Sequence, residues 1–165
     1  MRQEFDKRTD QPAEKQADQS ERQGWLGLLA RAPLDVLEHW AHQDTTSGLP
    51  PHTWLRRPET GLAMVRARAG GSGEKFNLGE MTVTRCALRL ASGETGIAYV
   101  QGRSSRKAEL AAMADCLLQS PEQRDAVERD LMAPLRRLLD QARQKKHAQA
   151  QATRVDFFTL VRGEN

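Results

Sequence analysis

The sequence predicts an α+β fold. It would contain an N-terminal helical hairpin, an antiparallel meander sheet with a C-terminal strand added, and two helices packed on one face. Apolar residues recur with helical spacing near both ends of the chain and alternate in the middle, where glycines separate the alternating runs. A length of 165 residues with 38% hydrophobic residues suits one domain with one core.

Domain organisation follows the distribution of apolar residues. Residues 1–20 contain almost none, so they cannot bury enough surface to offset the entropy of ordering. We expect a charged tail there, or a helix that only a partner orders. Residues 21–165 would form a single domain, with the helical hairpin at 21–44 and a sheet-and-helix body at 61–165.

The predicted hairpin has two short apolar stripes. Pro33 suits the first turn of the second helix, because its missing N–H would be unpaired there anyway. Each helix has about ten residues, too few to be stable alone, so the pair must pack on the body or on a partner. The stripe residues are Trp25, Leu26, Leu28, Leu29 and Ala32, then Leu34, Leu37, Trp40 and Ala41.

The next segment, TTSGLPPHTWLRRPETG, holds three prolines and two glycines and is predicted to be a loop over residues 45–61. A half-buried strand follows from Met64, with Val65 and Ala67 on one face and Arg66 and Arg68 on the other.

Two more strands complete the predicted meander, joined by a turn at Ser92 and Gly93. Met81 and Val83 share one parity, whereas the apolar residues after Arg85 share the other. Either a bulge at Arg85 causes this change of phase, or both faces of the sheet are covered.

Helical spacing returns after residue 102. Ser120, Pro121 and Gln123 predict an N-cap, a first-turn proline and a capping box, and Pro134 should kink the following helix or split it at Ala133. The closing run RVDFFTLVR is apolar on both faces and is predicted to join the sheet.

Several classes of protein are disfavoured by composition. No apolar run is as long as a membrane span, and residues 1–23 lack the apolar core of a secretory signal, so we expect a cytoplasmic protein.

Cys86 and Cys116 form no CxxC pair and are interpreted as buried thiols. His39 and His42 are one helical turn apart without a third ligand at motif spacing, so no metal site is predicted. No catalytic constellation is recognisable.

An anion site is predicted at the turn before the helix that follows the sheet. Free N–H groups at a helix start attract anions, and Arg106 and Lys107 in the first turn oppose the helix dipole unless an anion is present. The alternative is a set of solvated basic side chains. The candidates are Arg103, Ser104, Ser105 and Arg106. The glycine-rich turn at 70–76 lacks the features of a phosphate loop and is interpreted as a flexible turn.

The sheet region is basic, with seven basic residues against three acidic ones between positions 66 and 106. If Arg66 and Arg68 lie opposite Arg85 or Arg89, like charges would face each other and an acidic ligand or partner would relieve them. A solvated face with the arginines splayed apart is the alternative. The residues predicted to contact a partner are Trp25, Trp40, Arg66, Arg68, Arg85, Phe157 and Phe158.

The runs GEKFNLGEMTVTRCALRL and GIAYVQGRSSRKAELAAMADCLLQ closely resemble the PhnG family, a subunit of the bacterial carbon-phosphorus lyase system. The hairpin WLGLLARAPLDVLEHWA and the closing RVDFFTLVRG are similar to the same family. The resemblance therefore covers nearly everything after the N-terminal tail, although it includes no catalytic signature.

The resemblance implies a hetero-oligomer with PhnH-, PhnI- and PhnJ-type subunits that displaces adenine from ATP by a phosphonate, forming an α-D-ribose 1-phosphonate 5-triphosphate. It implies no cofactor bound by this chain itself, since ATP and the phosphonate are substrates of the complex, and no membrane partner. A scaffolding subunit is the leading hypothesis. The alternatives are a subunit that contributes phosphate-binding residues to a shared site, and an independent basic module, for which nucleic acid is the less favoured partner.

Overall fold

A computed structural model describes residues 11–43, 49–68 and 73–152, with side chains from residue 19 onward. Helices pack on one side of a single antiparallel sheet, which confirms the predicted α+β class. The elements in order are α1 (Gln11–Arg31), α2 (Leu34–Gln43), β1 (His52–Ala67), β2 (Phe76–Leu90), β3 (Thr95–Gln101), α3 (Ser105–Gln119), α4 (Pro121–Val127), the π-helix η2 (Glu128–Met132) and α5 (Ala133–Ala152).

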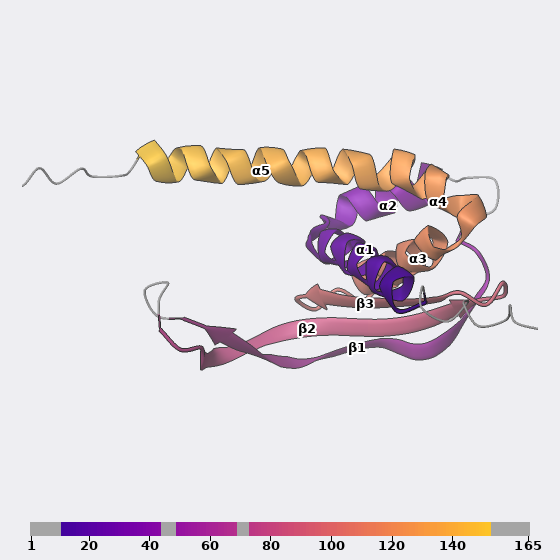
Figure 1. Ribbon diagram of the computed structural model, residues 1–165, viewed down its shortest axis with the longest axis horizontal. Helices are drawn as coiled ribbons and strands as arrows, with labels where there is room; N and C mark the ends of the chain where they lie inside the picture. The colour runs from indigo at the N-terminus through magenta and orange to yellow at the C-terminus, as the bar shows by residue number, and fades with distance from the viewer. Residues whose placement is uncertain (1–10, 44–48, 69–72, 153–165) are drawn as a thin grey trace, which may run out of the picture.

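The sheet has the order β1-β2-β3, and both pairs of neighbours are antiparallel. All helices lie on one side of it. Figure 1 shows α1 and α3 over the sheet and α2 and α5 in a further layer above them. The predicted meander is confirmed, including its turn, where Gly93 has a φ of 110° and donates to the Leu90 carbonyl.

The core lies between the sheet and the outer helices, with α3 at its centre. Strand β2 turns Cys86, Leu88 and Leu90 toward α3 and leaves Arg85 and Arg89 exposed, as alternation requires. Because α3 has the sheet on one side and other helices on the other, it is apolar nearly all round, and every residue from Leu110 to Leu118 is buried.

The predicted helical hairpin is confirmed, but its first helix is longer than expected. Helix α1 begins at Gln11 and so extends well into the segment predicted as a tail. The chain then turns at Pro33, whose carbonyl accepts the N–H of Leu37, and α2 begins at Leu34.

The loop predicted over residues 45–61 is wrong for most of its length, because β1 already begins at His52. Pro58 lies inside this strand. A proline is tolerated there because β1 is an edge strand, and the register with β2 shifts between Arg56 and Glu59, around the proline. The half-buried alternation from Met64 to Arg68 is confirmed.

The bulge predicted at Arg85 is also wrong. Arg85 pairs in register with Glu59 on β1 and Tyr99 on β3. The extra residues belong to β1, at register shifts between Trp54 and Arg56 and between Arg56 and Glu59. The phase changes because helices cover β2 only from Thr84 onward, where even-numbered residues face them. Met81 and Val83, on the opposite face, are only half-buried, so full coverage of both faces is not the explanation either.

The kink or split predicted at Pro134 takes the form of a π-helical turn, and the backbone is helical on both sides of it. Pro134 lacks an N–H, and its ring would collide with a carbonyl one turn earlier in a regular helix. The chain widens into η2 before it, and the Ala133 N–H reaches back to the Glu128 carbonyl. Pro121 occupies the first turn of α4 as expected, but the capping box does not form, since the Ser120 side chain makes no cap bond.

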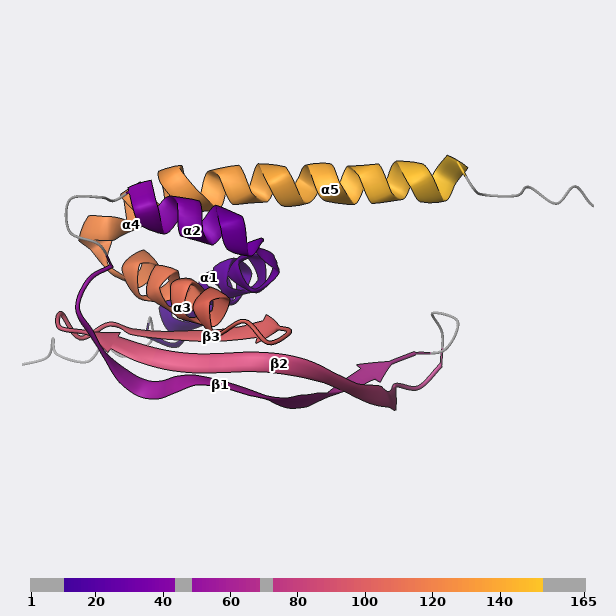
Figure 2. The same ribbon diagram turned by 180° about the vertical axis from the view of Figure 1, so that it is seen from behind.

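Two elements project from the same end of the molecule. Strand β3 pairs with β2 only along Val83 to Arg89, so the two-stranded β1–β2 ladder continues alone beyond it. We call residues 62–68, which include the end of β1, and residues 76–82 of β2 the arm. Figures 1 and 2 show α5 and the arm projecting past the body on the same side, with α5 above α1 and α3 and the arm below them. The predicted C-terminal strand at 154–162 lies outside the described residues and stays a prediction.

Candidate functional site

The most heavily bonded polar group in the described part of the chain is the carboxylate of Asp115, on α3. Its side chain is fully buried. Arg22 of α1 donates to it twice, with Nη2 at 2.7 Å from Oδ2 and Nε at 3.2 Å from Oδ1, and the Trp25 indole Nε1 lies 2.8 Å from Oδ1. The backbone N–H of Ile97 on β3 donates to Oδ2 at 2.9 Å. One carboxylate therefore connects α1, α3 and the sheet.

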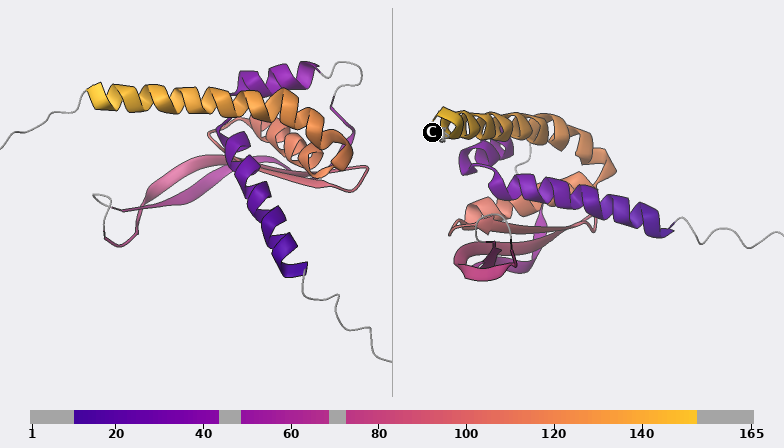
Figure 3. Two further views of the ribbon diagram at one scale, coloured as in Figure 1. Left: turned by 45° about the horizontal axis from the view of Figure 1, so that its top comes forward. Right: turned by 60° about the vertical axis from the view of Figure 1, so that its left-hand side comes forward.

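The same cluster binds the start of β3. Arg22 Nη2 also donates to the Thr95 carbonyl at 2.8 Å, and Gln119 Nε2 donates to that carbonyl at 2.9 Å. Figure 3 shows α1 crossing over the sheet and extending away from it, so these bonds fix the angle at which the helix crosses. All of these donors belong to the same chain, so the Asp115 carboxylate is satisfied by hydrogen bonds within the fold.

Sequence reasoning missed this cluster. The signal was present: Asp115 is the one acidic residue in the stretch AAMADCLL of α3, and a carboxylate in an all-round apolar helix needs donors from elsewhere. Its partners Arg22 and Trp25 lie some ninety residues earlier in the chain. The spacing of residues could not have identified them.

An apolar groove of about 290 Å³ lies between α1 and β3. Leu26, Leu29 and Ala30 line it on the α1 side, and Ile97 and Tyr99 line it on the β3 side. The groove is at the small end of the range for ligand sites, and its lining offers no charged group to orient a polar ligand.

The predicted anion site lies at the start of α3, and its groups are largely used within the chain. Ser104 is the N-cap, and its Oγ accepts the Lys107 N–H at 3.2 Å. Arg106 Nη1 lies 2.9 Å from Glu109 Oε2. Arg103 and Ser105 are exposed at the same turn. Burial lowers the pKa of the half-buried Lys107, which therefore gains from any anion placed beside it.

The turn before this helix start is held firmly. Gly102 has a φ of 93°, a conformation that favours glycine, and its N–H donates to the Thr82 carbonyl at 2.9 Å. The buried Thr84 hydroxyl donates to the Gly102 carbonyl at 2.7 Å. The backbone that presents Arg103 is therefore fixed to β2.

The predicted juxtaposition of arginines does not occur. Arg85 pairs with Glu59, with Nε 2.7 Å from Oε1. The pKa of Glu59 is lowered first by its hydrogen bond from Arg56 and then by the one from Arg85. Arg66 lies opposite Asn77, and Arg89 opposite Thr53. The sheet places an acid beside Arg85, so like charges do not meet there.

The other predicted interface residues divide into two groups. Trp25 and Trp40 are buried in the chain's own core, which removes them from the candidate partner surface. Arg66, Arg68 and Arg85 are exposed. Phe157 and Phe158 lie outside the described residues, so their role stays a prediction.

Cys86 and Cys116 are free and buried, as predicted. Burial raises the pKa of the Cys86 thiol to about 12 and that of Cys116 to about 11. Both thiols therefore stay protonated near neutral pH and are poor nucleophiles.

The His39 ring lies beside the side-chain amide of Gln43, with its Nε2 2.7 Å from the Gln43 Nε2. Within the described ranges, no group of three or more His, Cys, Asp or Glu residues is placed to hold a metal ion.

Comparison with known proteins identifies the family. The family model described as "Phosphonate metabolism protein PhnG" matches residues 20–163. The chain belongs to the PhnG family. The match begins within α1, before Arg22 and Trp25, so it includes the Asp115 cluster, the arm and α5.

A PhnG relative from Rhizobium meliloti (strain 1021) is 44% identical over 147 residues, which is 88% of this chain and 92% of the relative. It is named alpha-D-ribose 1-methylphosphonate 5-triphosphate synthase subunit PhnG. Within the part of this chain that the structure describes, none of the helices has both the length and the apolar character that crossing a bilayer requires.

Proposed function

We propose that this chain is a subunit of an alpha-D-ribose 1-methylphosphonate 5-triphosphate synthase complex and that it supports assembly rather than chemistry. The observation that carries the proposal is the relative of that name, which is 44% identical over most of both chains. As the family resemblance implies, the other members are PhnH-, PhnI- and PhnJ-type subunits. We place the complex in the cytoplasm because ATP is its substrate.

The state of the reactive groups supports a scaffolding role. The buried carboxylate of Asp115 is bonded to Arg22, Trp25 and Ile97 of the same chain, and the raised pKa values of both thiols keep them protonated. General acid–base or nucleophilic catalysis needs groups with a free lone pair near the substrate. On this proposal, the partner subunits supply them.

Co-expression with the three partner types tests this function. We expect the chain to co-purify with them, and adenine release from ATP to require methylphosphonate, the partners and this chain together. The chain alone should release no adenine. Failure of the wild-type chain to co-purify would remove it from the complex, whereas adenine release by the isolated chain would make it an enzyme in its own right.

A second role is favoured by one observation, the exposed Arg103 at a helix start whose first turn has no acidic residue. We propose that Arg103 and Arg106 contribute to phosphate binding in an active site shared with a neighbouring subunit. The N–H groups of the first turn of α3 would add to their attraction for an anion.

The change Arg103→Ala with Arg106→Ala should lower kcat/KM of the assembled complex by about tenfold or more, because a hydrogen bond to a charged group contributes about 1.5–3 kcal/mol. Steady-state adenine release measures this effect. Arg129→Ala is the control, since Arg129 is exposed on η2 and bonded to its neighbour Asp130. Normal assembly with unchanged turnover would eliminate the phosphate-binding role and leave the scaffolding role intact.

A further inference from the structure

The arm carries a concentration of exposed apolar side chains. Leu62 is 66% exposed, Leu78 63%, Met64 53% and Phe76 46%. Four of the seven large hydrophobic residues that are exposed in the described chain thus lie on this short segment. A cluster of this kind on a soluble domain typically marks an interaction site.

The register of β1 with β2 shows which face part of this cluster occupies. Thr60 lies opposite the buried Thr84, on the face that the helices cover. Leu62 and Met64 follow at intervals of two, so they point to the same side of the sheet. They are exposed because α1 and α3, the helices next to the sheet, end before the arm (Figure 2). The core face of the sheet therefore continues past the body without its cover.

A two-stranded ladder without a packed face is marginally stable in water. Strand β3 pairs with β2 only as far as Val83, so the arm has no third strand beside it in the described chain. Residues 76–80 of β2 are all exposed. Its apolar face consequently gains stability only when another surface covers it.

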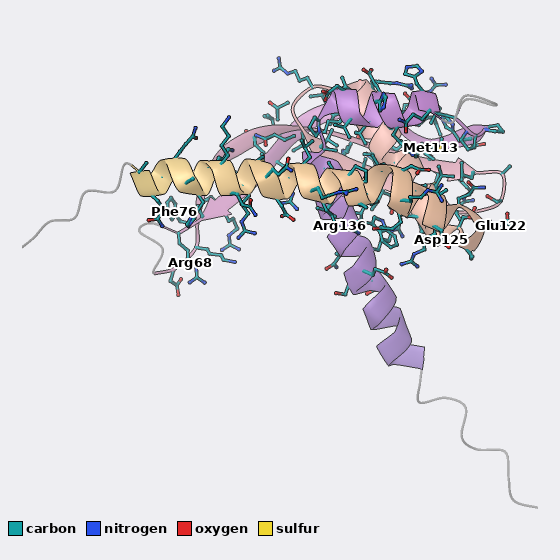
Figure 4. The ribbon with its side chains drawn as sticks, turned by 90° about the horizontal axis from the view of Figure 1, so that it is seen from above. Arg68, Phe76, Met113, Glu122, Asp125 and Arg136 are labelled. Atoms are coloured by element: carbon teal, nitrogen blue, oxygen red, sulfur yellow. The ribbon has the colours of Figure 1, made fainter. Side chains whose placement is uncertain are left out.

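Helix α5 is in the same situation. Every residue from Asp140 to Ala152 is exposed, so this half of the helix packs against nothing in the described chain. This half is positively charged, because Arg143, Lys145 and Lys146 stand against Asp140 alone. Seen from above, Arg68 and Phe76 of the arm lie toward the free end of α5 and away from Met113 in the body (Figure 4).

We propose that the arm and the exposed half of α5 form one docking surface for another subunit of the synthase complex, a protein that presents an apolar patch bordered by carboxylates. This inference rests on the proposed function. The apolar patch would cover Leu62, Met64 and Leu78, and the carboxylates would meet the basic residues of α5 and Arg66 and Arg68 of the arm.

Charge favours this occupant over the others. A second copy of the chain would bring one basic α5 and arm against another, and like charges across an interface oppose association. Residues 153–165 of the chain itself carry two arginines and two acidic residues, so they cannot neutralise α5. Nucleic acid would satisfy the charge, but its phosphate backbone offers no apolar surface for the leucines.

Paired substitutions of the two most exposed leucines test the surface. The change Leu62→Asp with Leu78→Asp should reduce the amount of partner subunit retained on the tagged chain by at least about tenfold, since burying unpaired carboxylates opposes docking. Both side chains are solvent-exposed, so the thermal melting of the isolated variant should match that of the wild-type chain.

Leu55→Asp is the matched control. Leu55 is 49% exposed on the same strand β1, but it lies in the body rather than on the arm, and this variant should retain the partners. Full retention by the arm variant, or equal loss in both variants, would overturn the proposal. Absence of the partners from the wild-type chain would instead count against the proposed function.

A photo-crosslinker identifies the occupant. Leu78 is replaced by benzoylphenylalanine, and the assembled complex is irradiated. Mass spectrometry then identifies the molecule that is crosslinked to this position. We expect a covalent link to an acidic region of another subunit. A link to a second copy, to residues 153–165 of the same chain or to nucleic acid would each overturn the assignment of the surface to another subunit.

Discussion

The substitution Gly96→Ala is expected to destabilise the folded chain by about 3 kcal/mol or more, at the upper end of what overpacking a core costs. Gly96 on β3 is buried directly beneath α3. A Cβ added there would lie 1.9 Å from the Ala112 carbonyl oxygen and 2.8 Å from Cys116 Sγ. The nearest atom belongs to the backbone of a helix, so β3 and α3 would have to separate. The midpoint of urea unfolding measures the loss.

Gly79→Ala is the matched control for this substitution. Gly79 is also a strand glycine, but a Cβ there meets nothing within 4 Å and its φ is not in the left-handed region. Its free energy of unfolding should change by less than about 1 kcal/mol. Equal midpoints for Gly96→Ala and Gly79→Ala would show that α3 does not approach the sheet as closely as described.

Replacing Asp115 by alanine should cost about 2–5 kcal/mol in the free energy of unfolding, because each buried donor left without its acceptor costs about 1–3 kcal/mol. The change leaves the Trp25 indole N–H and the Ile97 backbone N–H without their acceptor. It also removes the contact through which Arg22 holds α1 to α3. Urea unfolding followed by tryptophan fluorescence suits this test because Trp25 reports directly on the cluster.

Asp130→Ala provides the comparison for Asp115→Ala. Asp130 also binds an arginine, Arg129, but both side chains are exposed, and such pairs contribute at most about 1 kcal/mol. Similar losses for the two variants would mean that Asp115 is not the buried connection between α1 and the sheet.

Much of the fold could be predicted because local rules agreed with the tertiary structure. Pro134 interrupts the regular α-helix for a steric reason that holds in any context, and Gly93 turns the chain between two alternating runs. The rules failed where position in the sheet overrode them. Pro50, Pro51 and Pro58 indicated a loop, but a strand at the edge of a sheet can accommodate Pro58.

The candidate site was predicted less well, because its geometry depends on contacts that are distant in sequence. The N-cap of α3 is a local contact, which residues 102–107 narrow to Ser104 or Ser105, and Ser104 is the residue that forms it. The pairing of Arg85 with Glu59 required the register of β1, which the sequence did not reveal. The Asp115 cluster required knowledge that α1 crosses β3. The phosphate role of Arg103 and the strand at 154–162 stay predictions.

The central position of α3 has a consequence for local opening of the fold. Its amides can exchange with solvent only if the sheet separates from the helices above it, so their opening free energy approaches that of global unfolding. The arm and the outer half of α5 can open while the body stays intact. Stability is therefore graded within one small domain, highest at its centre and lowest at the two extensions that await assembly.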